Sequence, residues 1–213
     1  MKMKLLLTGF DPFGGEQTNP ALEAVMRVRD QIGTIQIIKR EVPTVFEKSV
    51  EVVKEMIKEE EPDMVICVGQ AGGRCDMTVE RVAINYMDAR IPDNEGNKPE
   101  DQPVIKDGEN AYFSTLPIKR MVTAMKEAGI PASVSNSAGT FVCNQLLYGV
   151  LHWIQKEGLP TKACFIHVPY LPEQVAKKET SYASMSLNDI IKALEVSIEC
   201  LQSLNFKSGN QIR

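Results

Sequence analysis

The sequence predicts an α/β protein with an open, mostly parallel sheet that helices cover on both faces. Apolar strand-like segments alternate with segments of helical periodicity along most of the chain, and this order is typical of parallel α/β folds. One strand-like segment, 63–69 (DMVICVG), has a continuous apolar run, as strands buried on both faces do. The 213 residues and 43% apolar content fit one domain over 1–213.

The first predicted unit is a strand, a loop and a helix. Residues 3–10 (MKLLLTGF) form an apolar run that ends at a turn rich in Gly and Pro, which predicts a buried strand. Asn19 is expected to cap the next helix, and Pro20 occupies the first helical position, where its missing N–H has no intrahelical partner to lose.

The second predicted unit has the same order. Residues 34–42 (TIQIIKREV) are strand-like, and Thr44 is expected to cap a helix over 45–60. Val50, Val53 and Ile57 form the apolar stripe of this helix.

The later segments continue the alternation. The predicted helices cover 117–129, 141–158 and 187–204, and the predicted strands cover 131–136 and 162–170. Two segments differ from this pattern. Residues 76–85 (DMTVERVAIN) alternate without a preceding helix, which predicts an antiparallel or extended strand outside the main sheet. Residues 86–110 form a long polar loop rich in Pro and Gly, and such loops are usually functional or disordered.

Composition excludes several classes of partner. The net charge is −4, and no run of Lys or Arg is long enough to neutralise a row of phosphates, so no nucleic acid partner is expected. No segment approaches the ~20 apolar residues that span a bilayer, and the N-terminal apolar run ends at Thr8, too early for a signal peptide. We therefore expect a soluble, cytoplasmic protein without a membrane partner.

The five cysteines predict neither disulfides nor a structural zinc site, because they are odd in number, scattered and without CxxC spacing. Cys67 and Cys164 lie inside apolar strands, and Cys200 lies in the last helix beside an apolar face, so packing explains all three. Cys143 lies in the first turn of a predicted helix, where the helix dipole stabilises a thiolate. Cys75, after a glycine-rich turn, is the only rival nucleophile.

Ligands of open α/β sheets bind beyond the carboxyl ends of the strands. Four segments are expected at that edge: 9–15 (GFDPFGG), 69–74 (GQAGGR), 137–144 (SAGTFVCN) and 167–170 (HVPY). They bring Cys143 and His167 to the same edge. The segment 69–74 lacks the spacing of the known phosphate-binding loops, so a tight turn explains it better than nucleotide binding.

The only two histidines are His152 and His167. His152 is expected on the solvated side of its helix, whereas His167 ends a strand at the predicted edge. A Cys/His pair also needs a group that orients the imidazole. The residues alone leave this choice open among Asp11, Asp76, Glu80 and Asp88.

Several long motifs resemble the pyroglutamyl peptidase I family, also called pyrrolidone carboxyl peptidases. They are TGFDPFGG with a following NP, VGQAGGR, VERVAIN, SNSAGTFVCNQLLYG and FIHVPYLPEQ, in this order and spacing. The likeness extends over nearly the whole chain. It implies a three-layer α/β/α sandwich, no metal or organic cofactor, peptides with N-terminal pyroglutamate as substrates and a homotetramer.

The resemblance also implies roles for single residues. Cys143 would be the nucleophile, His167 the general base and acid, and Glu80 the orienting carboxylate. Arg90 and the main-chain N–H of Cys143 would form the oxyanion site. The substrate pocket would comprise Phe10, Phe13, Gln70, Phe141 and Val142.

The implied substrate agrees with an apolar pocket. Pyroglutamate is a neutral lactam without the α-ammonium of an ordinary N-terminus, and an unpaired charge would lose much hydration free energy in an aromatic slot. Two other functions remain open on the residues alone: a cysteine amidase acting on another small cyclic or acyl amide, and a noncatalytic domain that binds a small ligand.

Overall fold

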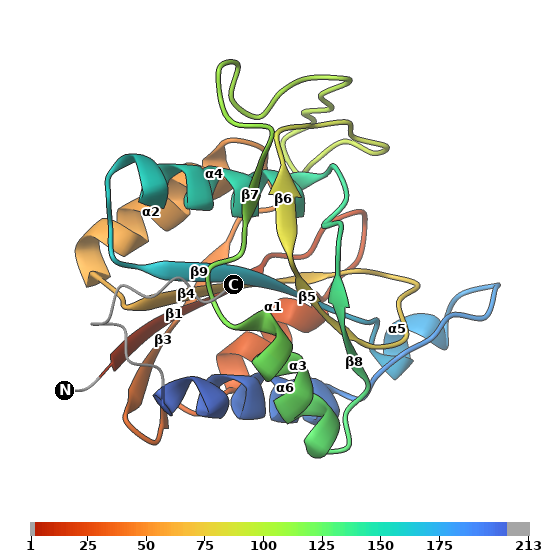
Figure 1. Ribbon diagram of the computed structural model, residues 1–213. Coiled ribbons are helices and arrows are strands. Elements are labelled where there is room, and N and C mark those ends of the chain that lie inside the picture. The colour runs from red at the N-terminus through yellow and green to blue at the C-terminus, as the bar shows by residue number, and fades with distance from the viewer. Residues whose placement is uncertain (1–2, 204–213) are drawn as a thin grey trace.

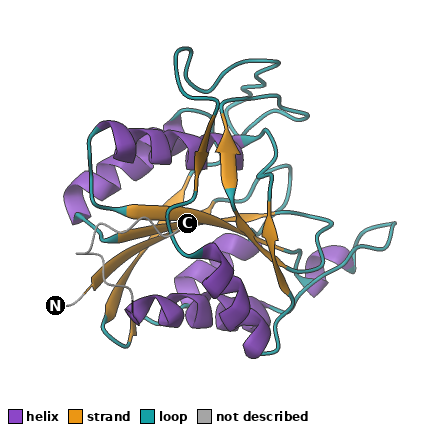
Figure 2. Ribbon diagram, in the orientation of Figure 1, coloured by secondary structure: helices purple, strands orange, loops and turns teal. Residues whose placement is uncertain are grey.

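A seven-stranded sheet forms the centre of the molecule, and helices lie on both of its faces in the computed structural model (Figures 1 and 2). The structure describes residues 3–203. In spatial order the strands are β2 (Gln31–Ile32), β3 (Ile35–Val42), β1 (Met3–Phe10), β4 (Met64–Gln70), β9 (Lys162–Val168), β5 (Met77–Glu80) and β8 (Ala132–Ser135). Strands β3, β1, β4 and β9 are parallel, which confirms the mostly parallel sheet.

The helices form two layers, which confirms the three-layer α/β/α arrangement (Figure 1). One face carries α1 (Pro20–Arg27), α3 (Ile118–Glu127) and α6 (Leu187–Glu199), and the other carries α2 (Lys48–Glu60) and α4 (Val142–Lys156). The short helix α5 (Pro172–Val175) follows β9, and a 3-10 turn over Cys200–Ser203 continues α6. No helix within residues 3–203 has the length and apolar character needed to cross a membrane.

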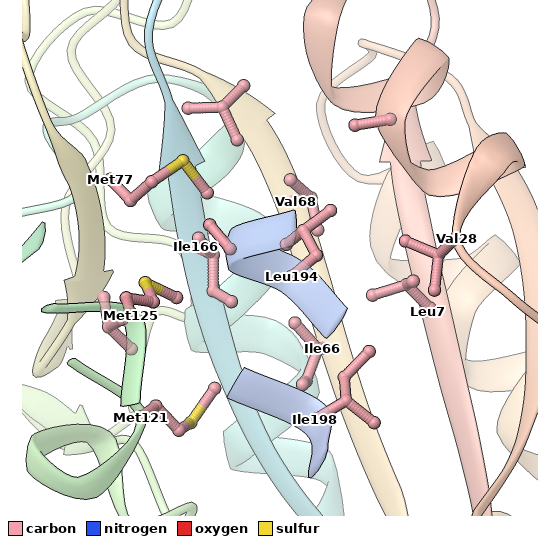
Figure 3. Packing of buried hydrophobic residues seen from close by; sticks show 14 of the residues in the cluster. Leu7, Val28, Ile66, Val68, Met77, Met121, Met125, Ile166, Leu194 and Ile198 are labelled. Atoms are coloured by element: carbon pink, nitrogen blue, oxygen red, sulfur yellow. The ribbon is translucent and has the colours of Figure 1, made fainter. Parts of the chain in front are cut away.

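The central strands supply two hydrophobic cores, because successive side chains of a strand point to opposite faces. On β1, Leu5 and Leu7 belong to the core under α1, α3 and α6, whereas Leu6 belongs to the core under α2 and α4. Figure 3 shows part of the first core, where Ile66 of β4 lies near Leu194 of α6. Both faces of these strands are therefore buried, as the continuous apolar runs predict.

The two predicted helix starts differ in outcome. Asn19 caps α1 by accepting the N–H two residues further on at 3.0 Å, and Pro20 is the first helical residue, as predicted. The expectation for Thr44 is wrong, because α2 begins only at Lys48. Thr44 instead donates its N–H to the Asp11 carboxylate at 2.6 Å and its hydroxyl to the Asp11 carbonyl. This residue thus ties the loop after β3 to the loop after β1.

The segment 76–85 contributes to two sheets. Strand β5 runs antiparallel to β9, with Thr78 opposite His167, and β8 runs parallel to β5. The predicted antiparallel direction is confirmed, but β5 lies inside the main sheet, between β9 and β8. The next residues form β6 (Val82–Ile84), which pairs with β7 (Ala111–Phe113) in a small antiparallel sheet beside α4 (Figure 1).

The long loop over 86–110 is held against its neighbours by hydrogen bonds. Asp93 is buried, and its carboxylate accepts three main-chain N–H groups at 2.8–2.9 Å, including that of Phe46 after β3. Asn94 donates to the carbonyl of Pro12 after β1 at 2.8 Å. The loop is therefore fixed over the edge of the sheet at which β1 and β3 end.

Helices α2 and α4 approach each other closely. A Cβ added at Gly149 of α4 would lie 2.7 Å from the side chain of Val50 on α2, so glycine permits this close contact. Further along α4, Trp153 is half-buried, and the Lys58 ammonium of α2 lies 5.9 Å from its ring centroid. This is within the range of a cation–π contact.

Candidate active site

A cavity of about 890 Å³ opens where β1, β4 and β9 end. The loops after these strands line it, together with residues 88–91 and 138–141, and both Cys143 and His167 face it. The strand before Cys143, β8, runs opposite to β9 and so departs from the parallel arrangement of the central strands. The connection from β8 to α4 nevertheless reaches the cavity.

Cys143 lies in the first turn of α4, two residues after the N-cap Phe141. The main-chain N–H groups of a first helical turn have no intrahelical partner, so they are free to bind a developing negative charge. The sulfur lies against Gly69 of β4, where an added Cβ would be 3.1 Å from Sγ. The absence of a side chain at Gly69 thus makes room for the thiol.

The Cys143 thiol is held in its neutral form. Desolvation by the surrounding protein raises the pKa of Cys143 to about 12, and the charge of Glu80 acts in the same direction. Arg74 opposes this rise. The helix start is expected to stabilise a thiolate, but desolvation by the surrounding protein outweighs this effect. Ionisation requires a proton acceptor at the sulfur.

His167 and Glu80 form a buried hydrogen-bonded pair. The distance from His167 Nδ1 to Glu80 Oε1 is 2.8 Å, and the two residues are 3% and 0% exposed. The antiparallel neighbours β9 and β5 place the two side chains together. Of the four carboxylates that the sequence left open, the structure brings Glu80 to the imidazole.

Burial and charge set the ionisation of this pair. Burial lowers the pKa of His167, and the charge of Arg74 lowers it as well, although the hydrogen bond that His167 donates to Glu80 and the charge of Glu80 oppose both. Burial alone would raise the pKa of Glu80, but hydrogen bonds from His167 and Arg74 hold it below its ordinary value. A neutral imidazole beside an ionised carboxylate is the arrangement that a general base requires.

Arg90 and Gln70 both line the cavity. Arg90 is exposed and makes no hydrogen bond or ion pair with any residue in 3–203, so its guanidinium is available to a ligand. Gln70 ends β4 and pairs with Val168 on one side, whereas the pairing of β1 with β4 ends at Val68. The main chain of Gln70 is thus unpaired toward β1.

The aromatic residues predicted for the pocket fall into two groups. Phe13 and Phe141 line the cavity, with ring centroids 6.2 Å apart. Phe10 is 2% exposed and Val142 is 0% exposed, and neither lines the cavity. Phe10 packs on Phe165, whose ring centroid lies 4.7 Å from that of His167. Phe10 and Val142 are thus buried beside residues that line the cavity.

The other cysteines and the second histidine do not line the cavity. Cys67 and Cys164 are buried, Cys200 is half-buried and Cys75 is exposed. His152 is not simply solvated, because its Nδ1 lies 2.9 Å from the hydroxyl of Tyr112.

Arg74 is a site residue that sequence reasoning missed. Its guanidinium lines the cavity and donates to Glu80 Oε1 at 2.7 Å. The residue is the last of the GQAGGR segment. The glycines of this segment predict a turn, but nothing in its pattern indicates the role of the arginine. Within residues 3–203 no group of three or more His, Cys, Asp or Glu side chains is arranged to hold a metal ion.

Comparisons with known proteins agree on one family. A family model described as pyroglutamyl peptidase matches residues 3–203. The pyrrolidone-carboxylate peptidase of Thermosipho africanus is 58% identical over 93% of this chain and 97% of its own length, and that of Clostridium perfringens is 59% identical over 93% of each.

Solved structures give the same result. The crystal structure of pyroglutamyl peptidase I from Bacillus amyloliquefaciens has a TM-score of 0.91 and 52% identity, and covers 94% of this chain and 95% of its own. A mutant pyrrolidone carboxyl peptidase from P. furiosus has a TM-score of 0.91 and 45% identity, and covers 95% of this chain and 100% of its own.

Proposed function

The chain belongs to the pyroglutamyl peptidase family and is a cysteine exopeptidase, and we propose that Cys143, His167 and Glu80 carry its reaction. The observation that supports this assignment best is the buried His167–Glu80 pair at 2.8 Å, in the cavity that Cys143 also lines. A nucleophile, a base and a group that orients the base are the parts that this type of catalysis needs.

The first half-reaction forms a thioester. Because His167 Nδ1 is bound to Glu80, Nε2 is the nitrogen that takes the proton of the Cys143 thiol as Sγ attacks the carbonyl carbon of the pyroglutamyl residue. The resulting oxyanion is stabilised by Arg90 and by the N–H of Cys143. The C–N bond then breaks, and the proton on Nε2 moves to the departing amine.

The second half-reaction returns the enzyme to its starting state. Water enters the site left by the amine and gives a proton to His167 Nε2 while its oxygen attacks the thioester carbonyl. The C–S bond breaks, pyroglutamate leaves, and the proton on Nε2 returns to Sγ. Glu80 remains ionised throughout and stabilises the imidazolium that forms twice in each cycle.

Recognition of the lactam is assigned to the aromatic wall and the end of β4. Phe13 and Phe141 face the cavity and offer a slot for a neutral ring, whereas an N-terminal ammonium would lose its hydration there without a partner. The unpaired main chain of Gln70 supplies hydrogen-bonding groups for the lactam amide. A peptide with free N-terminal glutamine is therefore excluded.

The test is release of a fluorescent amine from its pyroglutamyl amide under reducing conditions, with wild type and Cys143→Ala compared. We expect turnover by wild type alone. Cys143→Ser should be nearly inactive as well, because a hydroxyl is a far poorer nucleophile than a thiol. Equal rates on the pyroglutamyl and glutaminyl amides would disprove the apolar slot, and full activity of Cys143→Ala would disprove the nucleophile.

A cytoplasmic location and a homotetramer complete the proposal. All five cysteines are free, which suits a reducing compartment. Phe113 on β7 is 66% exposed, and Ile84 and Tyr86 are also exposed, so the small sheet offers apolar surface for contact between copies. Light scattering on the purified protein measures the mass directly, and a monomeric mass would refute the tetramer.

A further inference from the structure

We propose that Arg74 is a positioning residue that fixes the Glu80 carboxylate and, through it, the imidazole of His167. The inference deepens the proposed function and rests on it, because it gives a role in that reaction to a side chain outside the Cys143, His167 and Glu80 set.

The hydrogen bonds of Glu80 converge on one oxygen. Glu80 Oε1 accepts from His167 Nδ1 at 2.8 Å and from Arg74 Nη1 at 2.7 Å. The other oxygen, Oε2, is buried without a hydrogen-bond partner among residues 3–203, and the nearby Ser135 hydroxyl donates to the Ser137 carbonyl instead. Rotation of the carboxylate is thus resisted by the guanidinium and the imidazole, and of the two only the guanidinium is permanently charged.

Arg74 is itself held from several sides. Its Nη1 also contacts the Thr78 hydroxyl on β5, and its Nη2 donates to the Ser137 carbonyl at 3.0 Å. Ser137 lies in the connection from β8 to α4, the helix that carries Cys143. One planar side chain therefore joins the strand of the orienting carboxylate to the segment that leads to the nucleophile, and a planar fork of donors suits this task better than a single ammonium.

The charge of Arg74 balances that of Glu80. The ionisable groups that face one another here are Arg74, Glu80, His167, Cys143 and the buried Cys67. Arg74 lowers the pKa of both His167 and Cys143, whereas Glu80 raises both. Without the guanidinium, the buried carboxylate would draw a proton onto His167 and remove the neutral base that thiol attack requires.

The experiment compares Arg74→Gln, Arg74→Lys and Arg81→Gln with wild type on the pyroglutamyl amide. Arg81→Gln is the matched control, because it removes the same charge from the neighbourhood of Glu80, while its side chain contacts Asn136 instead of Glu80. We expect Arg74→Gln to lower kcat about 10- to 100-fold, as loss of a supporting partner of a site residue does, with KM changed less than about two-fold since the pocket walls are intact.

The pH profile separates positioning from a general loss of structure. In Arg74→Gln the acidic limb of kcat/KM should move to higher pH, whereas Arg74→Lys should restore the limb but not the full kcat. Nitrogen NMR of the ring follows His167 without substrate, and the only other histidine, His152, is the internal reference. Nδ1 of His167 should keep its proton in wild type, and the titration midpoint of His167 should rise in Arg74→Gln.

The outcomes distinguish the two proposals. An inactive wild type refutes the proposed function. In another outcome the wild type is active, but Arg74→Gln and Arg81→Gln have the same kcat, the same acidic limb and the same His167 titration. That result refutes the role of Arg74 and leaves the proposed function intact. If Arg74→Gln does not fold by circular dichroism, Arg74→Lys decides: a wild-type kcat in that variant overturns the positioning role, and a lowered kcat with a wild-type limb supports it.

Discussion

At the scale of single residues, the surroundings of the Cys143 thiol and the His167 imidazole favour the neutral form of both. Burial raises the pKa of Cys143 to about 12 and lowers the pKa of His167. A proton must therefore pass from sulfur to nitrogen as the bond to carbon forms. The buried carboxylate of Glu80 makes this transfer possible, because it stabilises the imidazolium at the moment when it appears.

The lowered pKa of His167 predicts the pH dependence of activity. Protonation of the imidazole removes the base, and since its folded-state pKa lies below the ordinary value of 6.5, the acidic limb of kcat/KM should have its midpoint below pH 6.5. Initial rates at low substrate concentration give this midpoint when they are measured from pH 4 to pH 9, a range of ~5 units around the ordinary pKa. A midpoint above 6.5 would show instead that the site stabilises imidazolium at rest.

Arg90 provides a second test at this scale. Its guanidinium is exposed at the cavity and unpaired within residues 3–203, so its removal leaves no buried charge behind. Arg90→Ala should lower kcat by about 10²–10³, the usual effect of losing one oxyanion donor. Lys98→Ala, which removes a cation from another part of the same cavity, is the control and should change kcat little. Equal effects in the two variants would reduce Arg90 to a general electrostatic role.

At the scale of helices and strands, α4 carries the nucleophile and also packs against α2. Gly149 lets α4 approach α2, because a Cβ there would lie 2.7 Å from Val50. Gly149→Ala should destabilise the fold by about 1–3 kcal/mol through overpacking, although alanine is the better helix former. Urea unfolding followed by circular dichroism measures the change.

Val50→Ala tests the cause of that loss. In the double variant the added methyl occupies the space that Val50 vacates, so the two changes should be less destabilising together than the sum of the single variants. Simple additivity would place the strain elsewhere than in this contact.

Periodicity in the sequence predicted most of the elements, but not the place of β5 inside the main sheet or the direction of β8. An apolar run identifies β1, β4 and β9 as buried strands because each must match two apolar layers. The pattern of 76–85 says nothing of which neighbour it joins, so the insertion of β5 beside β9 required the structure. Thr44 was mistaken for a cap because its hydrogen-bond partner, Asp11, is distant in sequence.

The same limit applies to the candidate site. The helix start of Cys143 and the strand end of His167 are local signals, and these two residues were found from the sequence. The choice of Glu80 needed the family resemblance, since four carboxylates were available. Phe10 shares the face of Leu6 on β1, and the two-residue period of a strand directs it into the core.

At the scale of the whole molecule, buried ionisable groups predict how stability changes with pH. Burial raises the pKa of Cys67 to about 11 and that of Cys164 well above its ordinary value. Above about pH 9 the unfolded chain therefore releases thiol protons that the folded chain keeps, and stability falls as pH rises. Below pH 6.5 the unfolded chain binds a proton that His167 does not, and the lowered pKa of Glu80 adds to this at lower pH, so stability falls as pH drops.

The urea midpoint should thus be highest between about pH 6.5 and pH 9. At pH 10 each buried thiol should lower the free energy of unfolding by about 2 kcal/mol. Cys67→Ala should make the alkaline decline shallower, whereas Cys75→Ser, at an exposed position, should leave its slope unchanged. A urea midpoint that stays constant from pH 7 to pH 10.5 would contradict the assigned burial, because pH 10.5 is about two units above the pKa of ordinary thiols.

The position of Trp153 has an optical consequence. It is the single tryptophan of the chain, and about 15 Å of α4 separates it from Cys143, at ~1.5 Å per residue. Its emission depends on the contact with Lys58 and α2 rather than on what occupies the cavity. Intrinsic fluorescence therefore reports the packing of α2 and α4 and not the contents of the active site. One emission signal can compare the folding of every site variant, with or without substrate.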